Sequence, residues 1–172
     1  PSNPYNAKGL LISAIRDNDP VIVFNHTLLM GMRGTQHVSE EPINVPEEPY
    51  VVPIGKADIA REGTDVTIVG IGHSTHVSLQ AAQELEARGY SAEVIDLLSL
   101  SPMDNEAILA SVRKTRKIVI TDEDYPRCSI ASDISALVAE EAFDYLDAPP
   151  RRVTAPHTSV PYSRVLEELY LP

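Results

Sequence analysis

The chain has 172 residues and a formal net charge of −11, which is enough length for one hydrophobic core, or for one domain and part of another. The acidic balance argues against a nucleic-acid phosphate backbone as partner, because such binding requires a clustered positive surface. No apolar run approaches the roughly 20 residues that cross a bilayer, and the single Cys128 cannot form an internal disulfide. We therefore expect a soluble, cytoplasmic protein that has no membrane partner.

A helix is predicted over residues 5–16. Asn3 is the expected N-cap, Pro4 suits the first turn, and Pro20 follows the end of the helix. The apolar residues that share one face of this helix are Ala7, Leu10, Leu11, Ala14 and Ile15.

Residues 21–24 predict a short buried strand. A lone helix and strand cannot bury their apolar faces, so we expect residues 1–30 to close a domain whose earlier part lies outside this sequence, which starts at Pro1 rather than at a methionine. Residues 31–50 lose periodicity and read as an exposed linker. The following residues, 51–172, form the second predicted domain.

The clearest pattern is a strand, a turn, a helix and a second strand. Residues 66–71 form the first β-branched run, and Ser74 or Thr75 is the expected helix cap. The helix stops at Gly89, which suits a left-handed position, and the second strand covers 92–98. Two strands joined through a helix in one sheet are parallel. The predicted inner face of the helix consists of Val77, Ala81, Ala82 and Leu85.

The remaining elements are, in order, a short strand, a helix, a third parallel strand, a helix, a last strand and a terminal helix. Their predicted ranges are 56–59, 101–114, 117–121, 132–143, 152–154 and 161–171. The buried face expected for the helix at 132–143 consists of Ile134, Leu137, Val138 and Ala142. The pattern predicts an α/β fold with three layers and a mostly parallel sheet.

Two glycines, Gly70 and Gly72, imitate the fingerprint of dinucleotide-binding proteins, with Asp96 near the end of the next strand as the acid that would bind a ribose. The third glycine is missing, because Thr75 occupies its place. The favoured interpretation is therefore that these glycines are needed only for a tight turn.

His73 and His76 are three residues apart and could serve as metal ligands or as an acid/base pair, but no cysteine or carboxylate stands at a ligand spacing nearby. The acidic run 122–125 follows a strand at the edge where open α/β sheets bind ligands. A solvated acidic loop is the favoured interpretation of that run.

Cys128 follows a basic residue and precedes a helix, which favours a thiolate. No convincing base accompanies it, so we interpret it as structural. His26, His37 and His157 lie in predicted loops, with no partner readable from spacing. The residues alone therefore predict no self-sufficient active site.

Several stretches, taken together, resemble the β subunit of thiamine-diphosphate-dependent 2-oxo acid dehydrogenases, the decarboxylating component of the pyruvate, branched-chain and acetoin dehydrogenase complexes. The stretches are AKGLL (7–11), SAIRDNDPV (13–21), VPIGKA (52–57), EVIDL (93–97), LSPMD (100–104), AFDYLDAP (142–149), RVT (152–154) and LP (171–172). The resemblance is colinear and is limited to the C-terminal half of that subunit. It implies a transketolase-like C-terminal domain, preceded by the helix and strand that end a pyrimidine-binding domain.

The resemblance also implies partners and cofactors. The β subunit pairs with an α subunit and a second β subunit, and the C-terminal domains dock the acyltransferase core, for which Glu167 and Glu168 are candidate contacts. Thiamine diphosphate and magnesium belong to the assembled enzyme, and the groups that act on them lie in the other half of the subunit. We therefore assign no catalytic or cofactor-binding residue here and expect this chain alone to be inactive. Asn25 and the run 124–129 depart from the family pattern, which leaves the substrate open.

A monovalent cation, potassium, is expected where the first helix ends. A helix leaves its last carbonyl groups without partners, and Asp17 and Asp19 add carboxylate oxygens in the same turn. Members of the resembling family hold potassium in the matching turn, which implies the carbonyl groups of Ala14 and Ile15 as further ligands. A solvated acidic helix end is the alternative.

Two other functions remain open. The chain could be a stand-alone assembly or binding module, or a nucleotide-binding α/β domain that uses residues 70–75. Calorimetric nucleotide binding would distinguish the latter.

Overall fold

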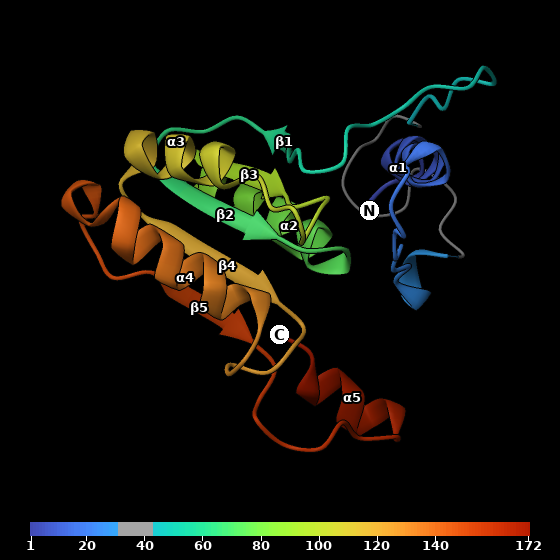
Figure 1. Ribbon diagram of the computed structural model, residues 1–172. Helices are drawn as coiled ribbons and strands as arrows, with labels where there is room; N and C mark the ends of the chain where they lie inside the picture. Colours follow the sequence, from blue (N-terminus) through green and yellow to red (C-terminus); the bar gives the residue numbers. More distant parts are fainter. Residues whose placement is uncertain (31–42) are drawn as a thin grey trace.

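A five-stranded sheet forms the centre of the protein in the computed structural model, which describes residues 1–30 and 43–172 (Figure 1). The strand order is β1-β3-β2-β4-β5, and only β1 runs antiparallel to its neighbour. The strands are β1 (Asp58–Arg61), β2 (Val66–Gly70), β3 (Ala92–Asp96), β4 (Ile118–Asp122) and β5 (Arg151–Thr154). This confirms the predicted α/β fold with a mostly parallel sheet, while the short first strand begins two residues later than expected.

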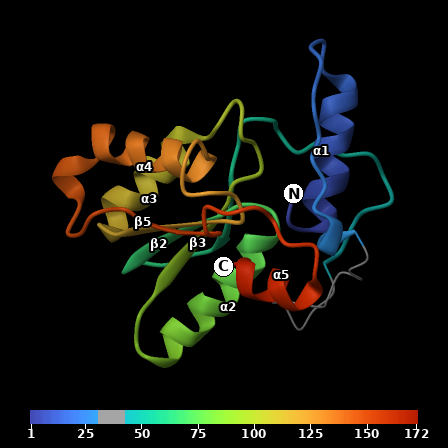
Figure 2. The ribbon, with the colours of Figure 1, turned by 90° about the horizontal axis from the view of Figure 1, so that it is seen from below.

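Helices cover both faces of the sheet, as Figure 2 shows. One face carries α2 (His73–Ala87), and the other carries α3 (Asn105–Thr115) and α4 (Ile130–Glu141). The side chains of a strand alternate between these faces, so Ile68 packs towards α2 and Val69 packs in the core with α3 and α4. The result is the predicted arrangement of three layers. A short α5 (Arg164–Tyr170) and two 3₁₀ turns, η1 (Thr27–Leu29) and η2 (Phe143–Tyr145), complete the described elements.

The predicted ends of the helices are confirmed only in part. The cap expected at Ser74 or Thr75 was wrong, because α2 begins at His73 and has Gly72 as its N-cap. Gly89 adopts φ +85°, as the left-handed position after α2 requires. Asp104 caps α3 by accepting a hydrogen bond from the Ala107 amide at 3.3 Å. In α4, the expected inner residues Ile134 and Val138 are fully buried.

The predicted inner face of α2 was partly wrong. Ala82 is buried and Leu85 packs against the same core cluster, but Ala81 is exposed. The buried side of α2 instead carries the small hydroxyl residues Ser74, Thr75 and Ser78. Their hydroxyl groups have partners inside the protein; Ser78 Oγ, for example, is hydrogen-bonded to Thr121 Oγ1 at 2.8 Å. Hydroxyl groups satisfied in this way can face a sheet as closely as alanine does.

The N-terminal helix α1 (Pro4–Arg16) lies beyond the carboxyl ends of the strands (Figure 1). Asn3 caps it by accepting from the Asn6 amide at 2.8 Å, as predicted. The helix contacts the segment that leads into the sheet, because Ser13 Oγ donates to the Val52 carbonyl at 2.6 Å and the Tyr5 and Tyr50 rings stack with centroids 4.5 Å apart.

Residues 1–30 bury only part of their apolar surface, as is expected of a helix and a segment that lack the rest of their domain. Leu10 is buried, whereas Leu11 and Ile15 are exposed, because only one side of α1 contacts the rest of the described chain. The expected strand at residues 21–24 is not formed: the segment is irregular, and Ile22 and Phe24 remain 79% and 75% exposed. A strand needs a neighbour for its amide and carbonyl groups, and no described strand pairs with this segment.

Candidate functional site

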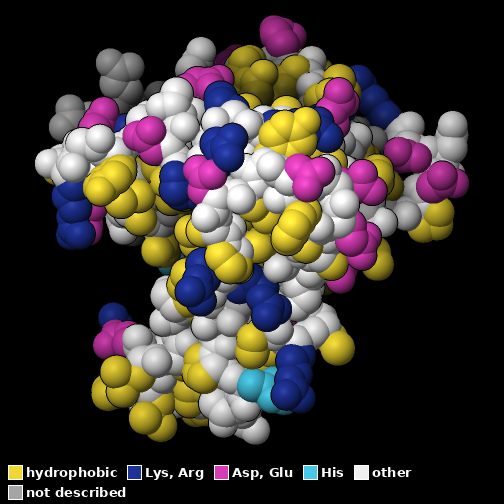
Figure 3. All heavy atoms as spheres, turned by 90° about the vertical axis from the view of Figure 1, so that its left-hand side faces the viewer, with side chains coloured by type: hydrophobic (Ala, Val, Ile, Leu, Met, Phe, Trp, Pro, Cys, Tyr) yellow, Lys and Arg dark blue, Asp and Glu magenta, His cyan; other side chains and the backbone are white. Residues whose placement is uncertain are grey.

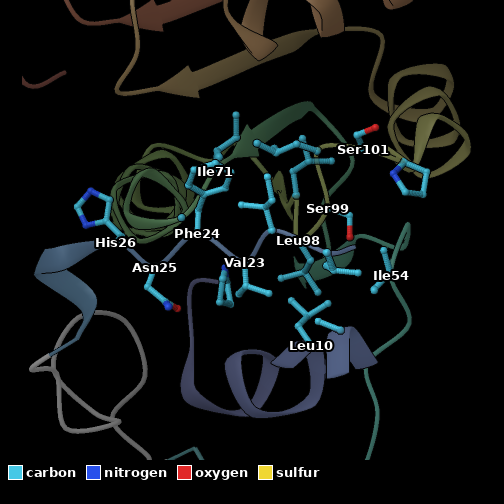
Figure 4. A pocket seen from close by; sticks show the side chains of 18 of the residues that line it. Leu10, Val23, Phe24, Asn25, His26, Ile54, Ile71, Leu98, Ser99 and Ser101 are labelled. Carbon is cyan, nitrogen blue, oxygen red and sulfur yellow. The ribbon is translucent and has the colours of Figure 1, made fainter. Parts of the chain in front are cut away.

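A cavity of about 710 Å³ lies at the carboxyl ends of the central strands (Figure 4). Ile71 and Gly72 follow β2, the segment 97–102 follows β3, and Asp122 and Glu123 lie at the end of β4. The opposite wall comes from α1 and from the irregular residues after it. The elements joined here are far apart in sequence, so only the fold assembles this cavity.

The position is the switch point of the sheet. The chain leaves β2 for β3 on one side and returns to β4 on the other. Crossover connections that depart in opposite directions leave a crevice outside the carboxyl ends of the strands, where open α/β sheets bind ligands. The topology therefore marks this cavity as the candidate site.

A carboxylate bridges two imidazoles at the cavity. His26 Nε2 lies 2.6 Å from Glu123 Oε2, and His73 Nδ1 lies 2.9 Å from Glu123 Oε1. The two rings stack with centroids 5.3 Å apart. His26 Nδ1 accepts a hydrogen bond from the Leu28 amide at 3.2 Å. The neutral ring therefore carries its hydrogen on Nε2, which donates a hydrogen bond to Glu123. This cluster ties the segment before η1 to the start of α2.

The interpretation of residues 122–125 as a solvated acidic loop was therefore wrong for Asp122 and Glu123. Asp122 is 7% exposed, and the Glu123 side chain is 23% exposed because it accepts from both histidines. His26 and Glu123 are 97 positions apart, so no spacing rule could have paired them. The available signal was the location of the acidic run at the end of a predicted strand.

Asp122 is a buried carboxylate at the end of β4, held by backbone groups. Its Oδ1 accepts the Asp124 amide hydrogen at 3.1 Å, its Oδ2 is buried, and a backbone hydrogen bond from Ala131 in the first turn of α4 lowers the pKa of the carboxyl group. Burial raises the pKa of this carboxyl group, because a buried charge loses its hydration.

The residues of the dinucleotide-like pattern are occupied by structural roles. A Cβ atom at Gly70 would lie 2.5 Å from Thr75 Cα, so this glycine allows β2 and α2 to approach closely. Asp96 is only 1% exposed and accepts hydrogen bonds from Ser2 Oγ and from Thr75 Oγ1. The acid expected for a ribose is thus enclosed by the protein, which supports the tight-turn interpretation.

The other candidate residues are dispersed. His73 and His76 have ring centroids 6.4 Å apart, and His76 Nε2 lies 2.7 Å from the Ser2 carbonyl oxygen. Among the described residues, no three histidine, cysteine or acidic side chains form a group that could hold a metal ion. Cys128 is exposed, and His157 packs edge-on against Tyr125.

The proposed ligands of potassium and the proposed partner contacts lie at two different places. Ala14, Asp17 and Asp19 line the cavity, and Asp17 Oδ1 accepts the Asp19 amide hydrogen at 3.0 Å. Ile15 is 75% exposed and does not line it. Glu167 and Glu168 lie on α5, exposed to solvent, and Glu168 accepts from Arg164 Nε at 3.2 Å. His37 lies outside the described residues.

Residues 55–172 match the sequence model of the family described as "Transketolase, C-terminal domain". The chain belongs to this family. A solved structure described as "Split gene transketolase, inactive beta4 tetramer" superposes with a TM-score of 0.58 and 32% sequence identity, covering 70% of this chain and 38% of that one. The similarity supports the assignment of the five-stranded unit to the transketolase C-terminal fold.

Curated relatives extend the similarity to the whole chain. It is 54% identical over 172 residues to the acetoin:2,6-dichlorophenolindophenol oxidoreductase subunit beta of Bacillus subtilis, covering 100% of this chain and 48% of that protein. It is 46% identical to the pyruvate dehydrogenase E1 component subunit beta and 42% identical to the 2-oxoisovalerate dehydrogenase subunit beta of the same organism, covering 50% of each. The chain thus spans about half the length of the curated relatives it matches, namely their C-terminal half.

Proposed function

We propose that this chain supplies the C-terminal part of the β subunit in the decarboxylating component of a 2-oxo acid dehydrogenase complex of the acetoin, pyruvate or branched-chain type. The observation that carries the proposal is an identity of 42–54% over 172 residues to three such β subunits. Identities of 54% and 49% to acetoin-type subunits favour the acetoin type over the other two. The proposed location is the cytoplasm, and no described helix has the length and apolarity to cross a membrane.

The proposed role is assembly rather than chemistry. Thiamine diphosphate with magnesium would be the cofactor of the whole enzyme, and it supplies the carbanion chemistry of decarboxylation when bound. The residues around the cavity do not fit it, because Asp17, Asp19, Asp122 and Glu123 line the walls and no described lysine or arginine does so. Such a lining repels a diphosphate. We therefore assign no step of the reaction to the described residues.

The proposed partners are an α subunit, a second β subunit and the acyltransferase core. Support comes from exposed apolar side chains on α5, where Val165 and Leu169 are 68% and 78% exposed. Figure 3 shows hydrophobic side chains gathered on the lower part of the molecule, at the height of α5 in Figure 1. The acidic pair Glu167 and Glu168 on the same helix would attract a basic domain of the core.

Potassium is proposed at the end of α1, with the carbonyl groups of Ala14 and Ile15 and the carboxylates of Asp17 and Asp19 as ligands. The support is the negative end of a 13-residue helix beside two carboxylates. The cation would offset the repulsion between these like charges.

A chimera tests the proposed function. The C-terminal half of the Bacillus subtilis acetoin-type β subunit is replaced by this chain, and the chimera is produced together with the matching α subunit. We expect assembly with the α subunit and oxidation of acetoin with dichlorophenolindophenol as acceptor. The control is the same β subunit shortened by its C-terminal half, which is expected to be inactive.

Two results would contradict the proposal. One is a folded chimera that does not associate with the α subunit. The other is turnover of acetoin, pyruvate or 3-methyl-2-oxobutanoate by the purified 172-residue chain alone. Calorimetric binding of ATP or NAD to the chain alone would favour the nucleotide-binding alternative, whereas assembly without activity would favour a binding module.

A further inference from the structure

We propose that His26, Glu123 and His73 form a proton-operated latch, in which a first proton bound by His73 preserves the turn η1 and a second proton bound by His26 dismantles it. The latch joins the segment before η1, whose His26 is labelled in Figure 4, to the end of β4 and the start of α2. The proposal goes beyond the assembly role and does not depend on it, because it concerns contacts within the described chain. Histidine is suited to such a latch, since its side chain ordinarily takes up a proton between about pH 8 and pH 5.

The hydrogen positions in the latch follow from its acceptors. A carboxylate has no hydrogen to donate, so both rings donate to Glu123, His26 from Nε2 at 2.6 Å and His73 from Nδ1 at 2.9 Å. The Leu28 amide donates to the other nitrogen of His26, Nδ1, at 3.2 Å. None of the described residues donates to His73 Nε2. The two rings therefore differ at the nitrogen that is left to take a proton.

The first proton is expected at His73. Protonation of its Nε2 displaces no hydrogen bond, and the imidazolium that results lies beside the Glu123 carboxylate. A charge-assisted hydrogen bond is stronger than a neutral one. His73 is the first residue of α2, so the positive end of that helix opposes the charge. We expect the carboxylate at 2.9 Å to outweigh the helix end, because it carries a full unit of charge.

The second proton, at His26, conflicts with the local backbone. It would place an N–H group at Nδ1 opposite the Leu28 amide, which would lose its acceptor. This hydrogen bond is the side-chain cap of η1. The rings of His26 and His73 stack with centroids 5.3 Å apart, so the second imidazolium also repels the first, and a single carboxylate balances only one of them. The second proton therefore removes the cap and leaves the latch with a net positive charge.

Other charged groups surround the latch. His76 lies on the same helix, with its ring centroid 6.4 Å from that of His73, and it donates from Nε2 to the Ser2 carbonyl. Asp124 follows Glu123 in the chain. The remaining charged groups line the cavity beside His26, and they are Asp17, Asp19, Asp122 and the amino end of Pro1. Because the two rings stack, these groups act on both and affect the pH range of the latch more than the order of its two protons.

NMR of the imidazole nitrogens tests this order. The isotope-labelled protein is titrated from about pH 8 to about pH 5. The ring signals distinguish a nitrogen with hydrogen, a bare nitrogen and an imidazolium, and the Leu28 amide signal reports the cap. We expect hydrogens on His26 Nε2 and His73 Nδ1 at the start. The half-change of the Leu28 amide should require at least about a tenfold higher proton concentration than that of His73 Nε2.

Variants separate the latch from a merely structural contact. His26→Asn keeps a side-chain oxygen that can cap η1 but cannot take a proton, so the Leu28 amide should no longer respond in this pH range. Glu123→Gln removes the counter-charge, and His73 should then require about a tenfold higher proton concentration. Glu141→Gln makes the same charge change at the exposed end of α4 and should alter this concentration less than about twofold.

A further variant serves if Glu123→Gln does not fold. In His73→Gln no imidazolium can form beside His26, so the Leu28 amide should respond at a lower proton concentration than in the original protein. An unchanged response of the Leu28 amide in this variant would contradict the proposed order.

Four other results would overturn the inference. These are a Leu28 amide that changes together with His73, a hydrogen on His26 Nδ1 at the start of the titration, a pH response of the Leu28 amide that persists in His26→Asn, and equal effects of Glu123→Gln and Glu141→Gln. None of these measurements involves the α subunit or acetoin, so the latch and the proposed function fail independently.

Discussion

Replacing Asp96 by asparagine should remove a pH-dependent cost to folding. Asp96 ends β3 and is 1% exposed. Burial raises the pKa of its carboxyl group from 3.8 to about 6, although hydrogen bonds from Ser2 and Thr75 and the nearby amino end of the chain lower it. The unfolded chain does not bury this group, so its pKa there remains at the ordinary value.

The sign and size of the effect follow from proton binding. Between pH 4 and pH 6 the folded state holds a proton on Asp96 that the unfolded state has lost, so stability falls as the pH rises through this window. A difference of about two pKa units corresponds to about 3 kcal/mol, which is an upper estimate. Asparagine has no charge to desolvate. Ser2 and Thr75 contact different oxygens of Asp96, so in the variant one hydroxyl group rotates to accept from the NH₂ group and the other continues to donate to the carbonyl oxygen. The net gain expected for Asp96→Asn at pH 7 is about 1–3 kcal/mol.

The assay is urea unfolding, followed by circular dichroism, of the original protein and of Asp96→Asn at several pH values between 4 and 8. The difference in the free energy of unfolding between the two proteins isolates residue 96, because the other carboxylates titrate alike in both. We expect this difference to rise in favour of the variant as the pH increases from 4 to 6, and to be constant above pH 7.

A matched control is Asp144→Asn, whose side chain is exposed, so its difference should be small and independent of pH. A pH-independent difference for Asp96→Asn would refute the reasoning. A difference that turns against the variant as the pH rises would refute it as well, because the carboxylate would then be stabilised rather than penalised in the folded protein.

Three further predictions concern packing, docking and the cation. Gly63→Ala should lower the free energy of unfolding by at least about 2 kcal/mol, because the added Cβ would lie 2.2 Å from backbone atoms of β3; Thr64→Ala is the control, and equal urea midpoints would contradict this. Reversing both charges of the glutamate pair 167–168 should weaken binding to the core's peripheral domain several-fold at low salt, whereas reversing the exposed glutamates 140–141 of α4 should not, as measured calorimetrically. Potassium should raise the melting temperature of the full-length β subunit by a few degrees over choline at equal ionic strength, and identical melting curves would exclude the site at 14–19.

Periodicity in the sequence was sufficient to predict the layers of the second half of the chain. The β-branched run that became β2 and the helical spacing of Ile134 and Val138 in α4 reflect burial on a strand and on one helix face. Gly89 marked the end of α2 through local backbone chemistry, and this prediction is confirmed. The start predicted for α3 at residue 101 was four residues too early, because Asp104 caps a helix that begins at Asn105. These features depend on near neighbours in the chain, which is why they can be read from it.

Burial of polar groups could not be read in the same way. Glu93 lies in β3 and is 2% exposed, because Lys114 from α3 reaches its carboxylate. Burial alone would raise the pKa of Glu93, but the hydrogen bonds from Lys114 and its neighbours hold it below its ordinary value. Ser78 on α2 is likewise buried through a partner on β4. Such positions depend on a partner from a distant element.

The sequence by itself thus determined the α/β architecture of this protein, the family resemblance and the ends of α1 and α2 at Arg16 and before Gly89, because local patterns encode them. Only the tertiary structure decided that His26, His73 and Glu123 meet, that residues 21–24 do not form a strand, and that a cavity lies at the carboxyl ends of the central strands. The physical reason is that long-range contacts depend on strand order and on helix placement, which arise from the packing of the whole chain.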